Sequence, residues 1–140
     1  MLVVLDAHVI IAGTLASTGA CHDILDIWLA GGFEAAACPR LLWEVEKALK
    51  HPRIAGKYQL DPADIDSWVR RLSAESSLHD DPEDPPSRVP DDPADDYLIQ
   101  LALDSNAVVL VSRDRHLKQA RIPTGLEVLP PSEFVARLRA

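Results

Sequence analysis

Continuous apolar runs alternate along the chain with segments whose apolar residues recur every three or four positions. The clearest runs are residues 2–5, which end at Asp6, and residues 107–111, which end in Ser-Arg-Asp. Uninterrupted runs rich in Val and Leu are typical of strands buried on both faces. Weaker strand candidates lie at residues 33–38, 77–78 and 126–129. The pattern predicts five short strands.

Five segments have the period of an amphipathic helix: residues 24–28, 41–49, 65–72, 98–102 and 134–138. Two of them begin with a clear signal, Asp61-Pro62 and Asp92-Pro93, in which the Asp caps the helix and the Pro takes its first turn. Ser132 is expected to cap the last helix. Strands that alternate with helices predict a three-layer α/β/α fold with a mainly parallel central sheet.

The length of 140 residues predicts one domain, residues 1–140, in which the Pro- and Asp-rich stretch 79–92 is a loop. Asp and Glu outnumber Lys and Arg by 22 to 14, which gives a net charge of −8. This balance argues against a broad basic face for nucleic acid. It does not exclude a phosphodiester substrate, because bound cations would cancel negative charge where carboxylates cluster.

Other features exclude several classes of protein. Cys21 and Cys38 lack the spacing of metal ligands and are too few for a disulfide framework. No apolar stretch approaches the roughly 20 residues that span a bilayer. The signatures of nucleotide hydrolysis, zinc proteolysis and serine-esterase chemistry are missing. We therefore expect a soluble, cytoplasmic protein without membrane contact.

Four acidic residues stand out because the predicted fold would bring them together. Asp6 and Asp114 follow predicted strands, and ligands of parallel α/β sheets bind beyond the carboxyl ends of the strands. Glu44 and Asp95 lie on the helical segments. Carboxylate oxygens are the ligands that Mg²⁺ and Mn²⁺ prefer. Ser112, beside Asp114, offers a hydroxyl that can donate to a carboxylate or a phosphate.

Each of these acids also has a structural interpretation. Asp6 would cap the turn at residues 7–8, and Asp114 would cap a helix over residues 115–120. Glu44 would be a solvated helix charge, and Asp95 would favour a helix N-terminus. The residue pattern does not choose between Glu44 and Glu46, or between Asp95 and Asp96.

Three further groups of residues bear on the site. His8 follows Asp6 by two positions and should lie near it, whereas the other histidines have no metal-binding spacing. Core packing is the expected role of the tryptophans: Trp28, Trp43 and Trp68. Basic residues after the fourth predicted strand would contact phosphates or form a solvated helix face: Arg113, Arg115, Lys118 and Arg121.

Ordered motifs along nearly the whole chain resemble the PIN domain, and specifically the VapC-like toxins of toxin-antitoxin pairs. They are LDAHVII at the start, CPRLLWEVEKALKHPRI, DDPADDYLIQLALDSNAVVLVSRDRHL, and LEVLPPSEFVARL at the end. The resemblance assigns the acidic metal-site positions to Asp6, Glu44, Asp95 and Asp114, and the hydroxyl position to Ser112. The chain departs from the family at His8, where Asn or Ser is usual.

The resemblance implies a metal-dependent endoribonuclease that uses Mg²⁺ or Mn²⁺ to hydrolyse RNA. It also implies a homodimer that a small cognate antitoxin protein silences. The alternative is a catalytically silent PIN-like domain that binds RNA or a protein partner; His8 and the acidic composition favour this alternative slightly, and the retained acids argue against it.

Overall fold

A five-stranded sheet forms the centre of the computed structural model, which describes residues 1–90, 92–118 and 120–140. The strand order is β3-β2-β1-β4-β5, and every pairing is parallel. The strands are β1 (Leu2–Leu5), β2 (Glu34–Ala37), β3 (Ser77–Leu78), β4 (Val109–Val111) and β5 (Glu127–Leu129). The predicted strands and the mainly parallel sheet are confirmed.

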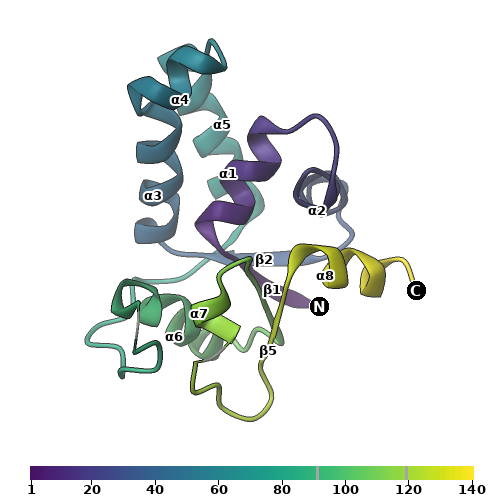
Figure 1. The fold of residues 1–140 in the computed structure, drawn as a ribbon, viewed down its shortest axis with the longest axis vertical. Helices are drawn as coiled ribbons and strands as arrows, with labels where there is room; N and C mark the ends of the chain where they lie inside the picture. Colours follow the sequence, from purple (N-terminus) through teal and green to yellow (C-terminus); the bar gives the residue numbers. More distant parts are fainter. Residues whose placement is uncertain (91, 119) are drawn as a thin grey trace.

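Helices cover both faces of this sheet (Figure 1). The helices are α1 (Ala7–Leu15), α2 (Ala20–Leu29), α3 (Pro39–Lys50), α4 (Pro52–Lys57), α5 (Pro62–Glu75), α6 (Asp96–Asp104), α7 (Arg115–Lys118) and α8 (Pro131–Leu138), with a 3₁₀ turn, η1, at Pro93–Asp95. Helices α1, α2, α3 and α5 lie above the sheet in Figure 1, and α6 lies below it. The fold is the three-layer α/β/α architecture expected of this pattern.

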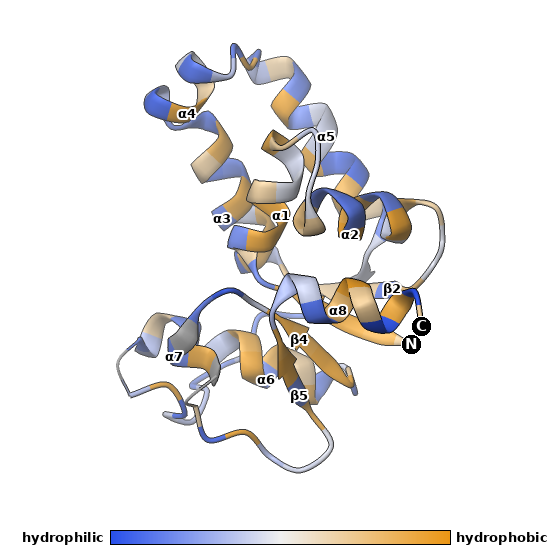
Figure 2. Cartoon of the chain, turned by 45° about the vertical axis from the view of Figure 1, so that its right-hand side comes forward, coloured by the Kyte–Doolittle hydropathy of each residue, from blue (hydrophilic) through white to orange (hydrophobic). Residues whose placement is uncertain are grey.

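The central strands explain why acidic residues meet at one edge. Val3, Val4 and Leu110 are completely buried, and β4 is coloured as hydrophobic along its length in Figure 2. Strands β1 and β4 pair with Leu5 opposite Val111, so the residues that follow these two strands leave the sheet side by side. The backbone N–H of Asp6 donates to the carbonyl of Val111 at 3.0 Å, which fixes this alignment.

Several local expectations were wrong. The turn expected at residues 7–8 is the start of α1, and neither α1 nor α4 was predicted. Asp92 lies directly before the 3₁₀ turn η1 and not before α6, and its side chain makes no capping hydrogen bond. Helix α8 begins at Pro131, one residue before the expected cap Ser132.

The three tryptophans differ in burial. Trp28 is 4% exposed and belongs to the core, as expected. Trp68 is partly buried and donates to the hydroxyl of Thr14 at 3.0 Å. Trp43 is 54% exposed, so the expected core role is wrong for this residue.

Residues 79–90 form a loop, as expected, and a buried acid holds it in place. The carboxylate of Asp96 accepts hydrogen bonds from the backbone N–H groups of Arg88, at 3.0 Å, and Val89, at 2.8 Å. Within the described part of the chain, no helix combines the length and apolar content of a membrane span.

Candidate functional site

Asp6 lies at the carboxyl end of β1 with both carboxylate oxygens held. It is 2% exposed. Oδ1 accepts from the backbone N–H of His8 at 3.1 Å, so Asp6 does cap α1. Oδ2 accepts from the hydroxyl of Ser112, which follows β4 and is completely buried, at 2.6 Å. The structural and functional interpretations of Asp6 are therefore compatible, because one oxygen serves the helix and the other faces the adjacent strand end.

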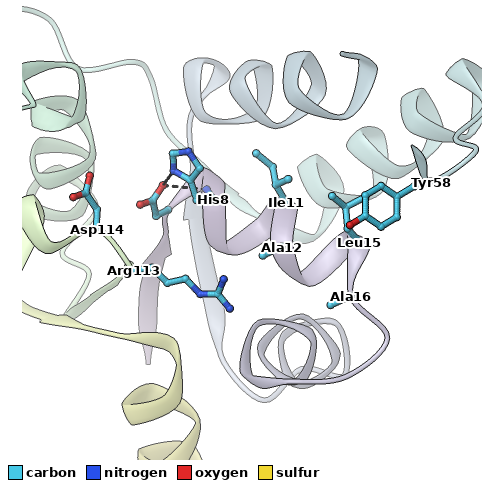
Figure 3. A pocket seen from close by; sticks show the side chains of 9 residues that line it. His8, Ile11, Ala12, Leu15, Ala16, Tyr58, Arg113 and Asp114 are labelled. Carbon is cyan, nitrogen blue, oxygen red and sulfur yellow. Dashed lines mark hydrogen bonds and ion pairs between the residues drawn. The ribbon is translucent and has the colours of Figure 1, made fainter. Parts of the chain in front are cut away.

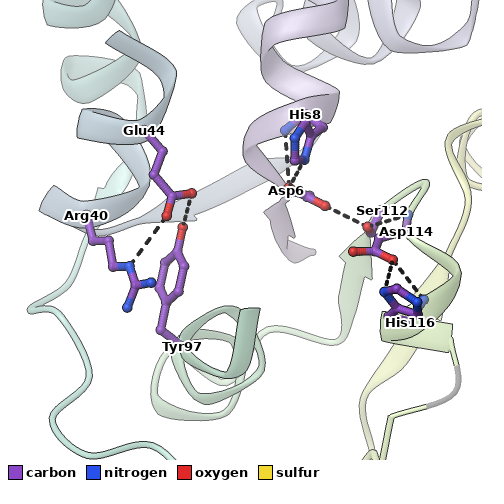
Figure 4. A network of polar contacts seen from close by, with 8 residues as sticks. All are labelled: Asp6, His8, Arg40, Glu44, Tyr97, Ser112, Asp114 and His116. Atoms are coloured by element: carbon purple, nitrogen blue, oxygen red, sulfur yellow. Dashed lines mark hydrogen bonds and ion pairs between the residues drawn. The ribbon is translucent and has the colours of Figure 1, made fainter. Parts of the chain in front are cut away.

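His8 places a positive charge beside Asp6. Its Nδ1 atom lies 3.5 Å from Oδ1 of Asp6 (Figure 4). The contact with Asp6 raises the pKa of His8 to about 9. Burial opposes ionisation of Asp6, but the contacts with His8 and Ser112 outweigh that effect and lower the pKa of this carboxyl. The result is a buried carboxylate next to an imidazolium that is largely exposed to solvent.

Asp95 and Asp114 extend the acidic group. Partial burial, followed by the negative charges of Asp6, Asp92 and Asp114, raises the pKa of Asp95 to about 8. The backbone N–H of Asp114 donates to the hydroxyl of Ser112 at 2.9 Å, which links the acid to β4. The structure thus brings Asp6, Asp95 and Asp114 into one electrostatically coupled group.

Asp114 also acts as the cap that its position suggested. Its Oδ1 accepts from the backbone N–H of His116 at 2.8 Å, at the start of α7. Asp92, Asp114 and His116 each offer one possible metal-ligand atom, and these three atoms lie within 4.8 Å of one another, a spacing that one metal ion spans.

The sequence did not predict this set. Asp92 was interpreted as a helix cap, and His116 had no partner at metal-ligand spacing along the chain.

Glu44 lies to one side of this group. Its Oε2 accepts from the hydroxyl of Tyr97 at 2.8 Å, and its Oε1 lies 3.4 Å from Nε of Arg40. The Arg40 guanidinium stacks 4.1 Å from the centroid of the Tyr97 ring and donates to the carbonyl of Ala94 at 3.0 Å. Figure 4 shows Glu44 turned toward Tyr97 and Arg40, with Asp6 between it and Asp114. Among the four acids, Glu44 is the one whose carboxylate contacts Tyr97 and Arg40, away from the group formed by Asp6, Asp95 and Asp114.

The two ambiguous pairs of acids differ in their partners. Glu46 pairs with Lys50 at 3.1 Å on the exposed side of α3, whereas Glu44 borders the same hollow as Asp95. Asp96 is buried and occupied by the loop amides described above. Glu44 and Asp95 are therefore the members of each pair with access to the site.

Two hollows open onto the acids and share His8 and Ile11. The first, about 650 Å³, is bordered by Asp6, Asp114 and Arg113 and extends along α1 to Tyr58 (Figure 3). The second, about 580 Å³, is bordered by Asp92, Asp95 and Glu44 and reaches Trp43. Of the four basic residues expected near phosphates, Arg113 borders the first hollow. Arg121 is exposed, and the side chains of Arg115 and Lys118 lie outside what the structure describes.

The donor set suits a hard divalent cation. Most of the possible ligands are carboxylate oxygens, and the imidazole of His116 is the remaining one. Carboxylates bind both Mg²⁺ and Mn²⁺, and imidazole also binds Mn²⁺. Partial burial, and after it the negative charges of Asp6, Asp92 and Asp114, raise the pKa of Asp95, and a bound cation would relieve the repulsion among these acids. The residues present therefore fit a divalent metal.

Comparisons with known proteins agree with this geometry. The family model described as PIN domain matches residues 2–116. The chain matches none of the curated proteins with which it was compared. It is similar to the crystal structure of PAE2754 from Pyrobaculum aerophilum with a TM-score of 0.64, over 99% of this chain and 90% of that one, at 20% identity. A likeness at this identity shows the fold, and the family match shows more: this chain belongs to the PIN domain family.

Proposed function

We propose that this PIN domain is a metal-dependent endoribonuclease that hydrolyses RNA phosphodiester bonds. PIN domains are generally nucleases, and the family match supports the reaction class. The observation that carries the proposal is the state of Asp6, a buried carboxylate held by Ser112 and coupled to further acids at the mouth of two hollows. Burial opposes the charge on Asp6, but the contacts with His8 and Ser112 keep the carboxylate ionised and able to bind a cation.

Asp6, Asp95 and Asp114 would hold Mg²⁺ or Mn²⁺, and Glu44 would join them. Asp92 and His116 are the further ligands available beside Asp114. A bound divalent cation supplies neutralising charge at the scissile phosphate and makes a water molecule more acidic.

The protein's own residues would orient the reaction. Ser112 donates to Asp6 and accepts from the backbone of Asp114, so one hydroxyl aligns two of the acids. Tyr97 restrains the Glu44 carboxylate. Arg113 borders the first hollow beside Asp6 and Asp114, where its guanidinium would bind a phosphate of the substrate.

Cleavage of labelled RNA by the purified protein tests this proposal. Reactions with Mg²⁺, Mn²⁺ or EDTA are run with the parent protein, Asp6→Asn and the control Asp64→Asn, which changes an exposed acid in the first turn of α5. We expect cleavage that needs a divalent ion and Asp6 but not Asp64. Cleavage by Asp6→Asn at the parent rate would refute the assignment, and no cleavage with either metal would favour the silent RNA- or protein-binding domain.

The motif resemblance further supports the role of toxin in a toxin-antitoxin pair. In that role the protein would act in the cytoplasm as a homodimer and be silenced by a small cognate antitoxin protein. Induced expression should arrest bacterial growth with the parent sequence and not with Asp6→Asn. Unimpaired growth with both, at equal protein levels, would contradict the toxin role and leave the nuclease proposal to the cleavage assay.

A further inference from the structure

Two exposed aromatic residues border the hollows that open onto the acids. Within the described residues, five large hydrophobic side chains are exposed: Met1, Trp43, Tyr58, Leu78 and Val108. The two aromatic ones are Trp43, 54% exposed on α3, and Tyr58, 41% exposed just after α4. Each of them lines one of the two hollows, whereas Leu78 and Val108 line neither. The exposure of aromatic surface is thus concentrated beside the candidate site.

Each ring is accompanied by a lysine. Nζ of Lys47 lies 4.8 Å from the centroid of Trp43, and Nζ of Lys57 lies 5.4 Å from that of Tyr58. These distances fit cation–π contacts, which leave much of each ring open to solvent and put positive charge beside it. An exposed ring of each hollow is therefore paired with a cation: Trp43 with Lys47, and Tyr58 with Lys57.

The two hollows connect these rings to the acids. In Figure 3 the first hollow runs from Asp114 past His8 and along α1 to Tyr58. From His8 to Leu15 the helix rises about 10 Å, at about 1.5 Å per residue, so Tyr58 lies roughly that far from the acids. The second hollow is lined by Asp95, His8 and Trp43. A flexible strand that crosses the acids at His8 would therefore find one ring in each hollow.

The charges along this path suit a polyanion. The chain carries a net charge of −8, yet a basic side chain stands among the acids of each hollow: Arg113 in the first and Lys47 in the second. Grooves that combine basic side chains with aromatic platforms are the usual means of binding single-stranded nucleic acid, because unpaired bases stack on the rings. A protein partner fits less well, since lysine is depleted from the cores of protein interfaces.

We propose that Trp43 and Tyr58 are base-stacking residues that hold unpaired nucleotides of an RNA strand in the two hollows that open onto the acidic centre. The inference rests on the proposed function for its choice of RNA. Unpaired bases can reach the two rings, whereas bases paired in a duplex are already stacked on one another.

Binding is measured apart from cleavage by placing all variants in the Asp6→Asn background. The probe is a fluorescently labelled RNA oligonucleotide of mixed sequence, alone or annealed to its complement, followed by anisotropy. The variants are Trp43→Ala and Tyr58→Ala, the ring-preserving Trp43→Phe and Tyr58→Phe, and the control Leu78→Ala, which changes an exposed apolar residue outside both hollows.

We expect each alanine variant to weaken single-strand binding about tenfold, as loss of one stacked base does. The phenylalanine variants should recover most of that loss, Leu78→Ala should bind like its parent, and the duplex should bind weakly to all. The inference is overturned if the alanine variants bind the single strand like the parent. It is also overturned if those variants instead change the sedimentation coefficient, because the rings would then form an interface between copies of the chain.

The two proposals fail in different ways. Cleavage that needs metal and Asp6 but is indifferent to both rings would remove the stacking role and leave the nuclease. Single-strand binding that depends on both rings, from a parent protein that cleaves nothing, would support the stacking role and remove the nuclease.

Discussion

Replacing Asp95 with Asn should make the protein more stable at neutral pH, because this carboxyl is held among other negative charges. Its pKa rises from 3.8 to about 8 through partial burial and the nearby Asp6, Asp92 and Asp114. An acid whose pKa is raised in the folded state contributes stability that is complete below the unfolded pKa. That contribution is lost as the pH rises from 3.8 to about 8. Asn keeps the shape of the carboxyl and never acquires the charge.

The size of the effect follows from the same shift. Stability falls by at most about 1.4 kcal/mol for each pH unit in which the folded state alone keeps the proton, or about 4 kcal/mol between pH 3.8 and 7. Asp95 is only partly buried, so water screens part of the repulsion and about 1–2 kcal/mol is the realistic gain. For a chain of this length that corresponds to a rise in melting temperature of about 5 °C.

Melting temperatures of the parent, Asp95→Asn and the control Asp64→Asn test this at pH 5 and pH 7.5 in EDTA. Asp95→Asn should melt above the parent, with a larger margin at pH 7.5, whereas Asp64→Asn removes a charge that favours the first turn of α5 and should melt no higher than the parent at either pH. Saturating Mn²⁺ should raise the melting temperature of the parent by more than that of Asp95→Asn, because the cation relieves the same repulsion that the substitution removes. A variant no more stable than the parent at pH 7.5, or a margin equal at both pH values, would refute the reasoning.

Three further changes probe the surrounding contacts. Tyr97→Phe removes the donor to Glu44 and should lower the free energy of unfolding by about 1 kcal/mol in urea denaturation; no loss would mean that this bond is unimportant. Asp96→Ala leaves the buried N–H of Val89 without its acceptor and should cost about 2–4 kcal/mol in the same assay, and a loss below 1 kcal/mol would contradict the anchoring of the loop. His8→Asn removes a contribution that is complete below pH 6.5 and lost as the pH rises through about 9, so the parent should melt above the variant at pH 6 and level with it at pH 9.5. Because His8 is exposed, we expect the difference in stability at pH 6 to stay below about 1 kcal/mol. A difference between parent and variant that grows as the pH rises would contradict the prediction.

Sequence periodicity predicted the strands well and the first helix not at all. The runs at residues 2–5 and 107–111 are apolar without interruption, a pattern consistent with doubly buried strands, and their short length and Val content favour a strand over a helix. Helix α1 packs against α2 and α3 and is apolar on nearly all sides. Its sequence therefore shows no alternation of apolar and polar residues with a helical period. Helix α4 is six residues long and contains Gly56, which leaves too few positions for a pattern.

Local chemistry predicted some site positions and missed contacts made across the fold. Asp6 was recognisable because it directly follows the buried strand β1, and Asp114 because it lies three residues after the end of β4. The role of Asp96 was not, since it depends on amides of a loop that folds back from residues 88 and 89. The restraint on Glu44 depends on Tyr97, 53 residues away, and on Arg40, one helical turn before it. The contact with Tyr97 follows from packing and leaves no mark on the spacing of residues, whereas the i, i+4 spacing of Arg40 and Glu44 is visible in the sequence.

The most direct test of a metal-dependent nuclease centre is to titrate Mn²⁺ while following both RNA cleavage and melting temperature of the same protein. The two curves should rise together and saturate at the same concentration, since the ion that stabilises the acids is the one that supports cleavage. Asp6→Asn should lose both responses. Cleavage that proceeds in EDTA, or a thermal response that survives in Asp6→Asn while cleavage stays at the parent rate, would contradict the account.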